Sequence, residues 1–402
     1  MNIAVFIKST TFHPNHGGLE VQNKILCEAF TQRGHAVTVY SPAGELNGIE
    51  ETVNGVLYKF VNVKPKNKIF TDHILGSNVR DEWYKESFEM FLEDHKNFPY
   101  DIALSQSSAG LGIIRHKNEV GIPVISIAHG TILGELKTVL SRPKRLLSLP
   151  GMLKDFVYVL KTLLTRQKEF IHGSDLVVAV SLFVKDNIIF ETGISREMVK
   201  VIYNGVEDMG VDPKIRETSK PSLIYVGRVE KDKGLFELVD CVSFLSEVLG
   251  DLRLNIVGRG SDEKALKEYA QSKGVSDRIH FFGFVKREEL KEFYESSHIF
   301  ILPTKRREGF PVTIPEAMMA SLPIVAMDLG GVNEGVFDNE TGFLIKAGNW
   351  RDFTQKIKLL LNDPKLRVRM GEGALKKAKE LFSVEKMANQ YLEVISEVLN
   401  SE

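Results

Sequence analysis

Two glutamates eight positions apart, Glu308 and Glu316, are the residues of this 402-residue chain whose types and spacing best suit binding chemistry. Glu308 precedes a glycine, and Glu316 falls in the first turn of a predicted helix. A carboxylate accepts hydrogen bonds from neighbouring hydroxyls, and such charge-assisted bonds are about twice as strong as neutral ones. The helix start nearby offers unpaired N–H groups to a phosphate. The pattern predicts a ligand that carries both sugar hydroxyls and phosphate.

Both glutamates also have a purely structural interpretation. Thr313 and Glu316 fit the S/T-x-x-E capping box, in which Glu316 would close its own helix. Glu308 would then be a solvated loop charge. A capped helix start would still hold Glu316 where a ligand needs it, so the structural and the binding interpretations both stay open.

Two cations open the second half of the chain. A predicted strand ends at Arg228, and Lys233 follows five positions later at the start of a predicted helix. The two side chains can converge beyond the strand and stabilise a diphosphate leaving group, with arginine as a fork and lysine as a point charge. The alternative is that both are ordinary surface charges of a loop.

The first half of the chain offers a glycine pair and a histidine. Gly17 and Gly18 lie between the first predicted strand and a helix, where backbone can approach an anion closely. No G-x-G-x-x-G dinucleotide fingerprint opens this helix, so a plain strand-to-helix turn is the alternative. His129 follows another predicted strand, although a single histidine is more often structural than catalytic.

Length and composition limit the class of protein. At about 100 to 200 residues per domain, 402 residues indicate two domains. The 52 lysines and arginines nearly balance the 53 aspartates and glutamates, so no global field favours nucleic acid. Cys27 and Cys241 show neither metal-ligand nor disulfide spacing and indicate reduced core residues of a cytosolic protein. Because no apolar run is long enough for a signal peptide or a membrane span, we expect a cytoplasmic protein.

Short apolar runs alternate with helical patterns, which is typical of parallel sheets covered by helices on both faces. The alternation restarts after Asn204-Gly205, and 208–221 is the candidate linker. Sheets of this kind bind ligands at the carboxyl ends of their strands. We predict strands at 3–7, 36–40, 101–104, 123–127, 176–180, 222–226, 252–257, 278–282, 299–302, 323–326 and 343–345, and final helices at 366–381 and 384–399.

Together, these segments resemble the retaining glycosyltransferases of family 4. The matches follow the family order and cover nearly the whole chain: Gly17 to Glu20, Arg33 to His35, Gly227-Arg228 with Lys233-Gly234, and Glu308 to Phe310 with Glu316-Ala317. The resemblance implies an α/β GT-B fold, in which two doubly wound Rossmann-like domains face each other across a cleft. It further implies an acceptor-side domain of 1–205 plus 384–402 and a donor-binding domain of 206–383.

The resemblance also implies roles for single residues. Arg228 and Lys233 would clamp the donor diphosphate, Glu316 would hold the ribose, and Glu308 would hold the transferred sugar. With His129 against the donor sugar, the implied catalytic residues are His129, Glu308, Arg228 and Lys233. The implied donor-binding residues are Gly17, Gly18, Arg228, Lys233, Gly258, Phe284, Val285, Glu308, Gly309, Phe310 and Glu316.

The sequence lacks the D-x-D element of metal-dependent transferases, since no two aspartates stand two positions apart. We therefore expect no metal and no cofactor, with charge neutralised by Arg228, Lys233 and helix termini. Similarity to the family implies retention at the anomeric carbon. We favour front-face attack, in which the leaving phosphate helps to deprotonate the acceptor hydroxyl.

Two segments depart from the family pattern around the expected site. Pro311 removes one backbone N–H from the loop that should meet the sugar. Lys305-Arg306-Arg307 precedes Glu308, and His298 stands at a position that is often acidic in the family. The basic run is either a solvated turn or a contact for an anionic sugar or a phosphorylated acceptor.

A basic segment from 137 to 168 follows His129. It holds eight lysines and arginines against one aspartate, interleaved with leucines and other apolar residues. Such a segment suits contact with an anionic membrane surface. The alternative is that its apolar stripe packs on the first domain while the basic residues face water.

The sequence thus predicts a metal-independent, retaining hexosyltransferase. It would move a sugar from a nucleotide-diphosphate donor to a lipid-linked or polysaccharide acceptor in cell-envelope glycan biosynthesis. We expect it in the cytoplasm, with 137–168 as a candidate peripheral contact on the inner face of the membrane, and without a nucleic-acid partner. A nucleotide-sugar epimerase of the same fold and a catalytically silent sugar-nucleotide binding protein are the alternatives.

Overall fold

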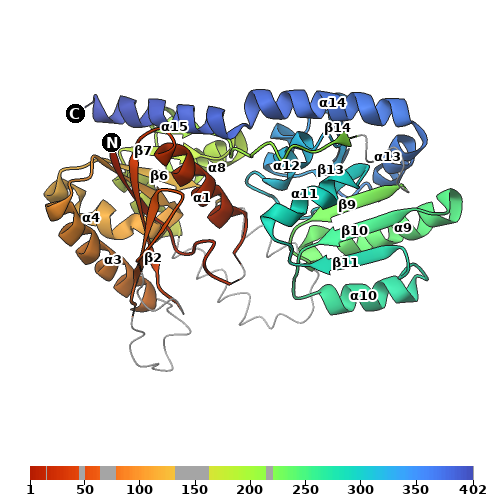
Figure 1. The fold of residues 1–402 in the computed structure, drawn as a ribbon, viewed down its shortest axis with the longest axis horizontal. Helices are drawn as coiled ribbons and strands as arrows, with labels where there is room; N and C mark the ends of the chain where they lie inside the picture. The colour runs from red at the N-terminus through yellow and green to blue at the C-terminus, as the bar shows by residue number, and fades with distance from the viewer. Residues whose placement is uncertain (15, 45–49, 64–77, 132–162, 214–220, 402) are drawn as a thin grey trace. The chain divides into compact units, whose positions relative to one another are not determined.

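The computed structural model describes the chain except residues 15, 45–49, 64–77, 132–162, 214–220 and 402 (Figure 1). The described residues form two compact units. Those of 1–205 together with 384–401 make up the first unit, and those of 206–383 make up the second.

The first unit is built on a sheet of eight described strands in the order β3-β4-β2-β1-β5-β6-β7-β8. Neighbouring strands run parallel except β3 and β4, which form an antiparallel hairpin. Near-continuous apolar runs explain the central strands, because both faces of a parallel sheet are buried. The strands are β1 Asn2–Phe6, β2 Ala36–Pro42, β3 Glu50–Val53, β4 Val56–Val61, β5 Ile102–Gln106, β6 Val124–Ala128, β7 Leu176–Ala179 and β8 Val199–Val201.

Two groups of helices cover this sheet (Figure 1). In one group α4 contacts both α3 and α7, and in the other the final helix, α15, packs on α1. Phe30 of α1 meets Tyr391 of α15 with ring centroids 6.3 Å apart, so the end of the chain belongs to the first unit. The helices are α1 Gly18–Thr31, α3 Asn78–Asn97, η1 Ser107–Gly110, α4 Leu111–Val120, η2 Leu163–Gln167, α7 Lys168–Gly173, α8 Leu182–Thr192, η3 Arg196–Met198 and α15 Val384–Leu399.

The second unit has a sheet of six described strands in the order β11-β10-β9-β12-β13-β14, all parallel. Among its helices, α9 contacts α10 and α13, and α14 contacts α12 and α13. The strands are β9 Ser222–Val226, β10 Arg253–Val257, β11 Ile279–Gly283, β12 Ile299–Leu302, β13 Ile324–Asp328 and β14 Gly342–Lys346. The helices are η5 Lys231–Lys233, α9 Leu235–Leu249, α10 Glu263–Ser272, α11 Arg287–Glu295, α12 Thr313–Met319, η6 Gly331–Glu334, α13 Trp350–Asn362 and α14 Pro364–Leu381.

The predicted doubly wound α/β fold is confirmed, and every predicted strand lies within about two residues of an observed one. The sequence prediction missed β3, β4 and β8. The β3 strand carries charged, exposed residues, and β8 has three residues, so neither shows an apolar run. Cys27 and Cys241 are buried free thiols, as expected.

Among the described parallel strands of each sheet, the strand order reverses at one point, and ligands of open α/β sheets bind at the carboxyl ends of the strands beside such a point. In the first unit it lies between β1 and β5, and in the second between β9 and β12. The loops that leave these strand ends are therefore the expected positions of functional side chains.

Glycine backbones lie against one another at the carboxyl ends of β9, β10 and β11. The Gly227 N–H donates to the Val257 carbonyl at 2.9 Å, and the Gly258 N–H donates to the Gly283 carbonyl at 2.7 Å. Gly258 has a φ of +132°, and a Cβ there would come within 1.9 Å of the Gly227 oxygen. Only glycine fits this contact, which fixes where the three loops begin.

We expect Gly258→Ala to destabilise the fold by more than about 3 kcal/mol, because both backbone strain and steric overlap oppose the new methyl group. The matched control is Gly274→Ala, where φ is +71° and a Cβ would meet nothing within 4 Å. Strain alone should cost that variant about 1 to 2 kcal/mol. Urea denaturation followed by circular dichroism measures both, and equal losses in the two variants would contradict this account.

Candidate functional site

An ion pair lies where the strand order of the second sheet reverses. Lys233 ends η5 after β9, Glu308 lies in the loop after β12, and their Nζ and Oε1 atoms are 2.6 Å apart. The Thr304 hydroxyl donates to the same Glu308 oxygen at 3.1 Å. The side chains of Lys233 and Glu308 are only 12% and 17% exposed, so both charges are largely withdrawn from water. Two of the predicted site residues are thus brought into direct contact.

Glycine backbones hold both partners of this pair in place. Gly234, next to Lys233, has a φ of +73°, and a Cβ there would come within 1.9 Å of the Pro303 carbonyl. Gly330 likewise lies against the backbone of Glu308, because a Cβ at position 330 would come within 2.3 Å of the Glu308 carbonyl oxygen. The Gly331 N–H donates to that carbonyl at 2.9 Å. The Gly330-Gly331 pair, which follows β13 in the sequence, is not among the predicted site residues.

The other predicted cation, Arg228, lies apart from this ion pair. Its side chain is 58% exposed, and its Nη1 binds the Glu230 carboxylate at 2.8 Å. Arg228 nevertheless follows β9 on the same loop as Lys233, at the carboxyl edge of the sheet. Arg228 and Lys233 therefore lie on one loop, but Arg228 binds Glu230 and Lys233 binds Glu308.

Glu316 lies on α12 and does not form the predicted capping box. The helix starts after Val312 without a side-chain cap, which puts Thr313 at the first helical position, so that prediction is wrong. The Glu316 carboxylate instead accepts from Arg287 Nη1 at 2.8 Å and from the Tyr294 hydroxyl at 3.2 Å. Neither partner was predicted from the sequence, because the contacts join α12 to the separate helix α11.

The charges around Glu316 support one another. Burial opposes the positive charge of Arg287, but its ion pairs with Glu316 and Glu207 outweigh this and raise the pKa of the guanidinium. Burial, together with the nearby Glu316 charge, holds the pKa of Tyr294 well above its usual value. Tyr294 therefore stays protonated and remains a hydrogen-bond donor to Glu316.

The remaining predicted donor-binding residues of the second unit differ in their exposure to solvent. Phe284 and Val285 follow β11, and Phe284 is 47% exposed. Phe310 is buried, with its ring centroid 5.3 Å from that of Phe382, so its side chain belongs to the core of the second unit. Gly309, between Glu308 and Phe310, is half-buried.

In the first unit, Gly17 and Gly18 mark the start of α1, as expected. Gly17 is the N-cap residue, and its N–H donates to the Glu20 carboxylate at 2.8 Å. Both glycines are exposed. Across the reversal point of this sheet, Lys8 donates to the Ser108 hydroxyl at 2.7 Å. The glycine pair is therefore a helix start at the edge where ligands bind in such sheets.

His129 follows β6 and is hydrogen-bonded to a buried amide. Its Nε2 lies 2.6 Å from Gln106 Oε1, and Gln106 Nε2 donates to Asn23 Oδ1 at 2.8 Å. In this arrangement Gln106 Oε1 is an acceptor, so His129 Nε2 carries the proton. Burial lowers the pKa of His129 to about 4, which makes the ring neutral at pH 7.

Other residues noted in the sequence have structural partners. His298 is buried with its Nδ1 3.1 Å from the Ser222 hydroxyl. Lys305 binds Glu237 at 2.6 Å, which favours the ordinary interpretation of the basic run before Glu308. In the described part of the predicted linker, Asp208 binds Lys379 at 3.0 Å.

Residues 137–162 of the basic segment 137–168 lie outside the described residues. Membrane contact through this segment therefore stays a prediction. No helix among the described residues is long and apolar enough to cross a membrane. Among the same residues, no group of three or more His, Cys, Asp or Glu side chains could hold a metal ion.

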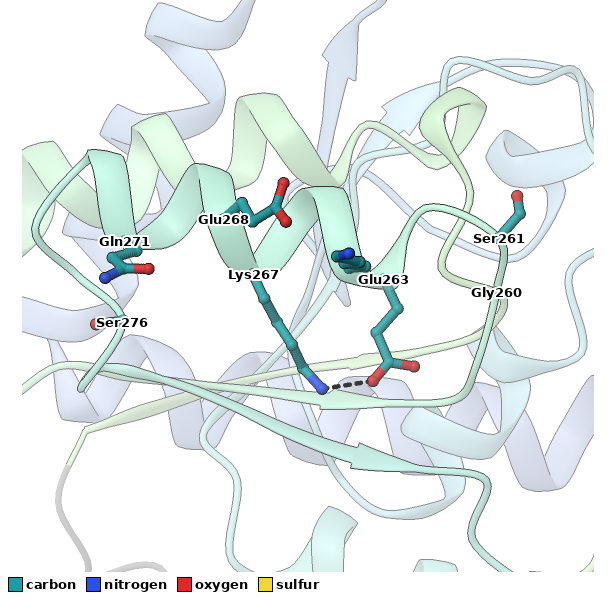
Figure 2. A pocket seen from close by; sticks show the side chains of 8 residues that line it. Gly260, Ser261, Glu263, Lys267, Glu268, Gln271 and Ser276 are labelled. Atoms are coloured by element: carbon teal, nitrogen blue, oxygen red, sulfur yellow. Dashed lines mark hydrogen bonds and ion pairs between the residues drawn. The ribbon is translucent and has the colours of Figure 1, made fainter.

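A pocket on the second unit lies beside α10 (Figure 2). Figure 2 shows its ion pair, in which Lys267 binds Glu263 at 2.6 Å. Gly260 belongs to the loop after β10, but no predicted catalytic residue lines this pocket. The pocket is lined by Gly260, Ser261, Glu263, Lys264, Lys267, Glu268, Gln271 and Ser276.

Two family profiles match consecutive parts of the chain. Glycosyltransferase Family 4 matches residues 16–208, and glycosyl transferases group 1 matches residues 212–377. An uncharacterized glycosyltransferase of Methanocaldococcus jannaschii is 30% identical over 56% of this chain and 59% of its own length. The capsular polysaccharide biosynthesis glycosyltransferase CapM of Staphylococcus aureus is 25% identical over 77% of this chain and 81% of its own. The chain spans about half the length of several other curated relatives that it matches.

Solved structures share the whole architecture. Sucrose-phosphate synthase from Thermosynechococcus elongatus has a TM-score of 0.78 at 18% identity and covers 100% of both chains. HepE of Anabaena, solved with UDP and glucose, has a TM-score of 0.73 at 18% identity and covers 99% of this chain and 100% of its own. At such identities the likeness shows the fold, which is GT-B. The chain belongs to the GT-B glycosyltransferases, with a Glycosyltransferase Family 4 region followed by a glycosyl transferases group 1 region.

Proposed function

We propose that this chain is a retaining glycosyltransferase that moves a sugar from a nucleoside diphosphate donor to a lipid-linked or polysaccharide acceptor in cell-envelope glycan biosynthesis. The observation that carries the proposal is the 2.6 Å ion pair of Lys233 and Glu308 where the second sheet reverses its strand order. CapM, named for capsular polysaccharide biosynthesis, and HepE, solved with UDP and glucose, support the acceptor and donor classes.

Lys233 would bind the phosphate side of the sugar–phosphate bond, and Glu308 would bind the sugar side. The Lys233 ammonium has three donors, and Glu308 accounts for one of them, which leaves donors for diphosphate oxygens. Glu308 accepts from Lys233 and Thr304 through one oxygen, Oε1. Its Oε2 would accept from hydroxyls of the transferred sugar.

Glu316 would hold the ribose of the donor. A carboxylate offers about four acceptor positions, and Arg287 and Tyr294 occupy one on each oxygen. The remaining positions suit two neighbouring hydroxyls of a ribose. Glu316 is only 4% exposed, and a hydrogen bond to an ionised group gains strength where little water competes for it.

The proposed reaction needs no protein nucleophile. The bond from the anomeric carbon to the phosphate oxygen breaks, and the acceptor oxygen forms its bond on the same face. The acceptor proton passes to the leaving phosphate, whose growing negative charge Lys233 and Arg228 stabilise. Neutral His129, which donates through Nε2 to Gln106, would present Nδ1 as an acceptor to a donor-sugar hydroxyl.

We expect a nucleoside diphosphate to raise the melting temperature of the protein in a screen of UDP, GDP, ADP and their sugars, and to do so in the presence of EDTA. A ligand at 100 times its dissociation constant stabilises the folded state by about 2.7 kcal/mol. If no nucleotide shifts the transition, the transferase proposal fails. If a shift and sugar transfer appear only after a divalent metal is added, metal independence fails.

The two glutamates should differ in what they contribute. Glu316→Gln should weaken nucleotide binding about tenfold or more, because a neutral amide accepts ribose hydrogen bonds less strongly. Glu308→Gln should lower kcat about a hundredfold with a smaller change in nucleotide affinity, as expected for a group that acts on the transferred sugar. Calorimetry and initial rates measure the two effects.

Glu288→Gln, at an exposed position of α11, is the control for both substitutions. The opposite pattern, with affinity lost at Glu308 and turnover lost at Glu316, would reverse the two assignments. A protein that binds nucleotide but releases no sugar to any acceptor would support the silent binding protein. Conversion of the nucleotide sugar into its epimer would support the epimerase.

Protonation of His129 should make the fold sensitive to acid. Its folded-state pKa of about 4 lies below the ordinary 6.5, so the unfolded chain binds a proton that the folded chain resists. Stability should therefore fall as pH drops from 6.5 to 4, and His129→Gln should reduce that loss. Urea midpoints measured across this window test the effect, and parallel curves for the two proteins would contradict it.

A further inference from the structure

Arg287 joins two carboxylates that lie in different parts of the second unit. Its Nη1 binds Glu316 on α12 at 2.8 Å, and its Nε binds Glu207, next to the start of the unit, at 3.2 Å. Because a guanidinium is planar, two partners on two of its nitrogens fix both its position and its orientation. Glu207 therefore holds the Arg287 side chain in place in addition to Glu316.

A single helix supplies both donors to Glu316. Arg287 begins α11, and Tyr294 stands seven positions later, which is about two helical turns and puts both on one face. Arg287 binds Oε1 of Glu316, while the Tyr294 hydroxyl binds Oε2. With one donor on each oxygen, the plane of the carboxylate is set by α11.

Burial makes this arrangement costly to lose. The Glu316 side chain is 6% exposed, and a buried carboxylate needs charged or hydrogen-bonding partners. The Nη2 atom of Arg287 is buried and has no hydrogen-bond acceptor among the described residues, which is unfavourable in itself. The contact with Glu316 is thus kept even though the guanidinium is incompletely satisfied.

We propose that Arg287, assisted by Tyr294, is a positioning residue that turns the Glu316 carboxylate toward the ribose hydroxyls of the donor. Arg287 then determines ribose recognition without touching the nucleotide. This inference rests on the proposed function, in which Glu316 binds the ribose. If Arg287 only stabilised the fold, its substitution would weaken the binding of ribose and 2′-deoxy nucleotides equally.

The test compares a nucleoside diphosphate with its 2′-deoxy form, using UDP or whichever base the thermal-shift screen selects. We expect wild type to bind the ribonucleotide about tenfold more tightly, because the deoxy form leaves a Glu316 oxygen without one hydrogen bond. Arg287→Met should lose most of this preference through weaker ribonucleotide binding, while affinity for the deoxy form changes little. Calorimetric titration of both ligands measures the ratio.

Two further variants keep the test decisive if Arg287→Met folds poorly. Arg287→Lys retains a charge but not the fork and should restore part of the preference. Tyr294→Phe removes the second donor with almost no change in volume and should also reduce the preference. The matched control is Arg253→Met, an exposed arginine at the amino end of β10, which should keep the wild-type ratio.

The outcomes separate this inference from the proposed function. If wild type prefers the ribonucleotide and all Arg287 and Tyr294 variants retain that preference, the positioning role is overturned while the proposed function stands. If wild type binds nucleotide without any ribose preference, Glu316 does not hold the ribose and both the assignment and this inference fail. Equal weakening of both ligands in the variants would assign Arg287 a structural role only.

Discussion

The ion pair of Lys233 and Glu308 is the interaction on which the candidate site depends. It joins the loops that leave two neighbouring strands, β9 and β12, at the edge where the strand order reverses. Glycines fix the backbone behind each partner, because any larger residue at Gly234 or Gly330 would meet a carbonyl oxygen. Opposite charges that are held this close and partly out of water form a polar centre that an anionic, hydroxyl-rich ligand suits.

A second set of charges, around Glu316, follows the same physical rule. A carboxylate that is almost fully buried requires partners, and α11 provides them through Arg287 and Tyr294. Arg287 in turn reaches Glu207, so the orientation of Glu316 depends on three separate segments of the second unit. In the first unit, His129 likewise depends on Gln106 and, through it, on Asn23.

Local sequence signals predicted the central strands of both sheets and the final helices well. Central strands such as β1 and β9 are short apolar runs, and helix starts such as Gly17-Gly18 follow directly from turn chemistry. The exposed strand β3 escaped prediction because its charged residues carry no apolar pattern. The capping box failed for a different reason, since Val312 and not Thr313 is the N-cap residue of α12. The Glu316 carboxylate binds Arg287 and Tyr294 instead.

The sequence by itself determined the two α/β units, most strands of each sheet and the motifs that carry the candidate site residues, because apolar periodicity and motif spacing are local properties. Only the tertiary structure decided which charges meet. Lys233 and Glu308 are 75 positions apart, and Arg287 and Glu316 are 29 apart. Their contacts depend on strand order and on the placement of α11 within side-chain reach of α12, which no local pattern encodes. For that reason Lys233, and not Arg228, became the partner of Glu308.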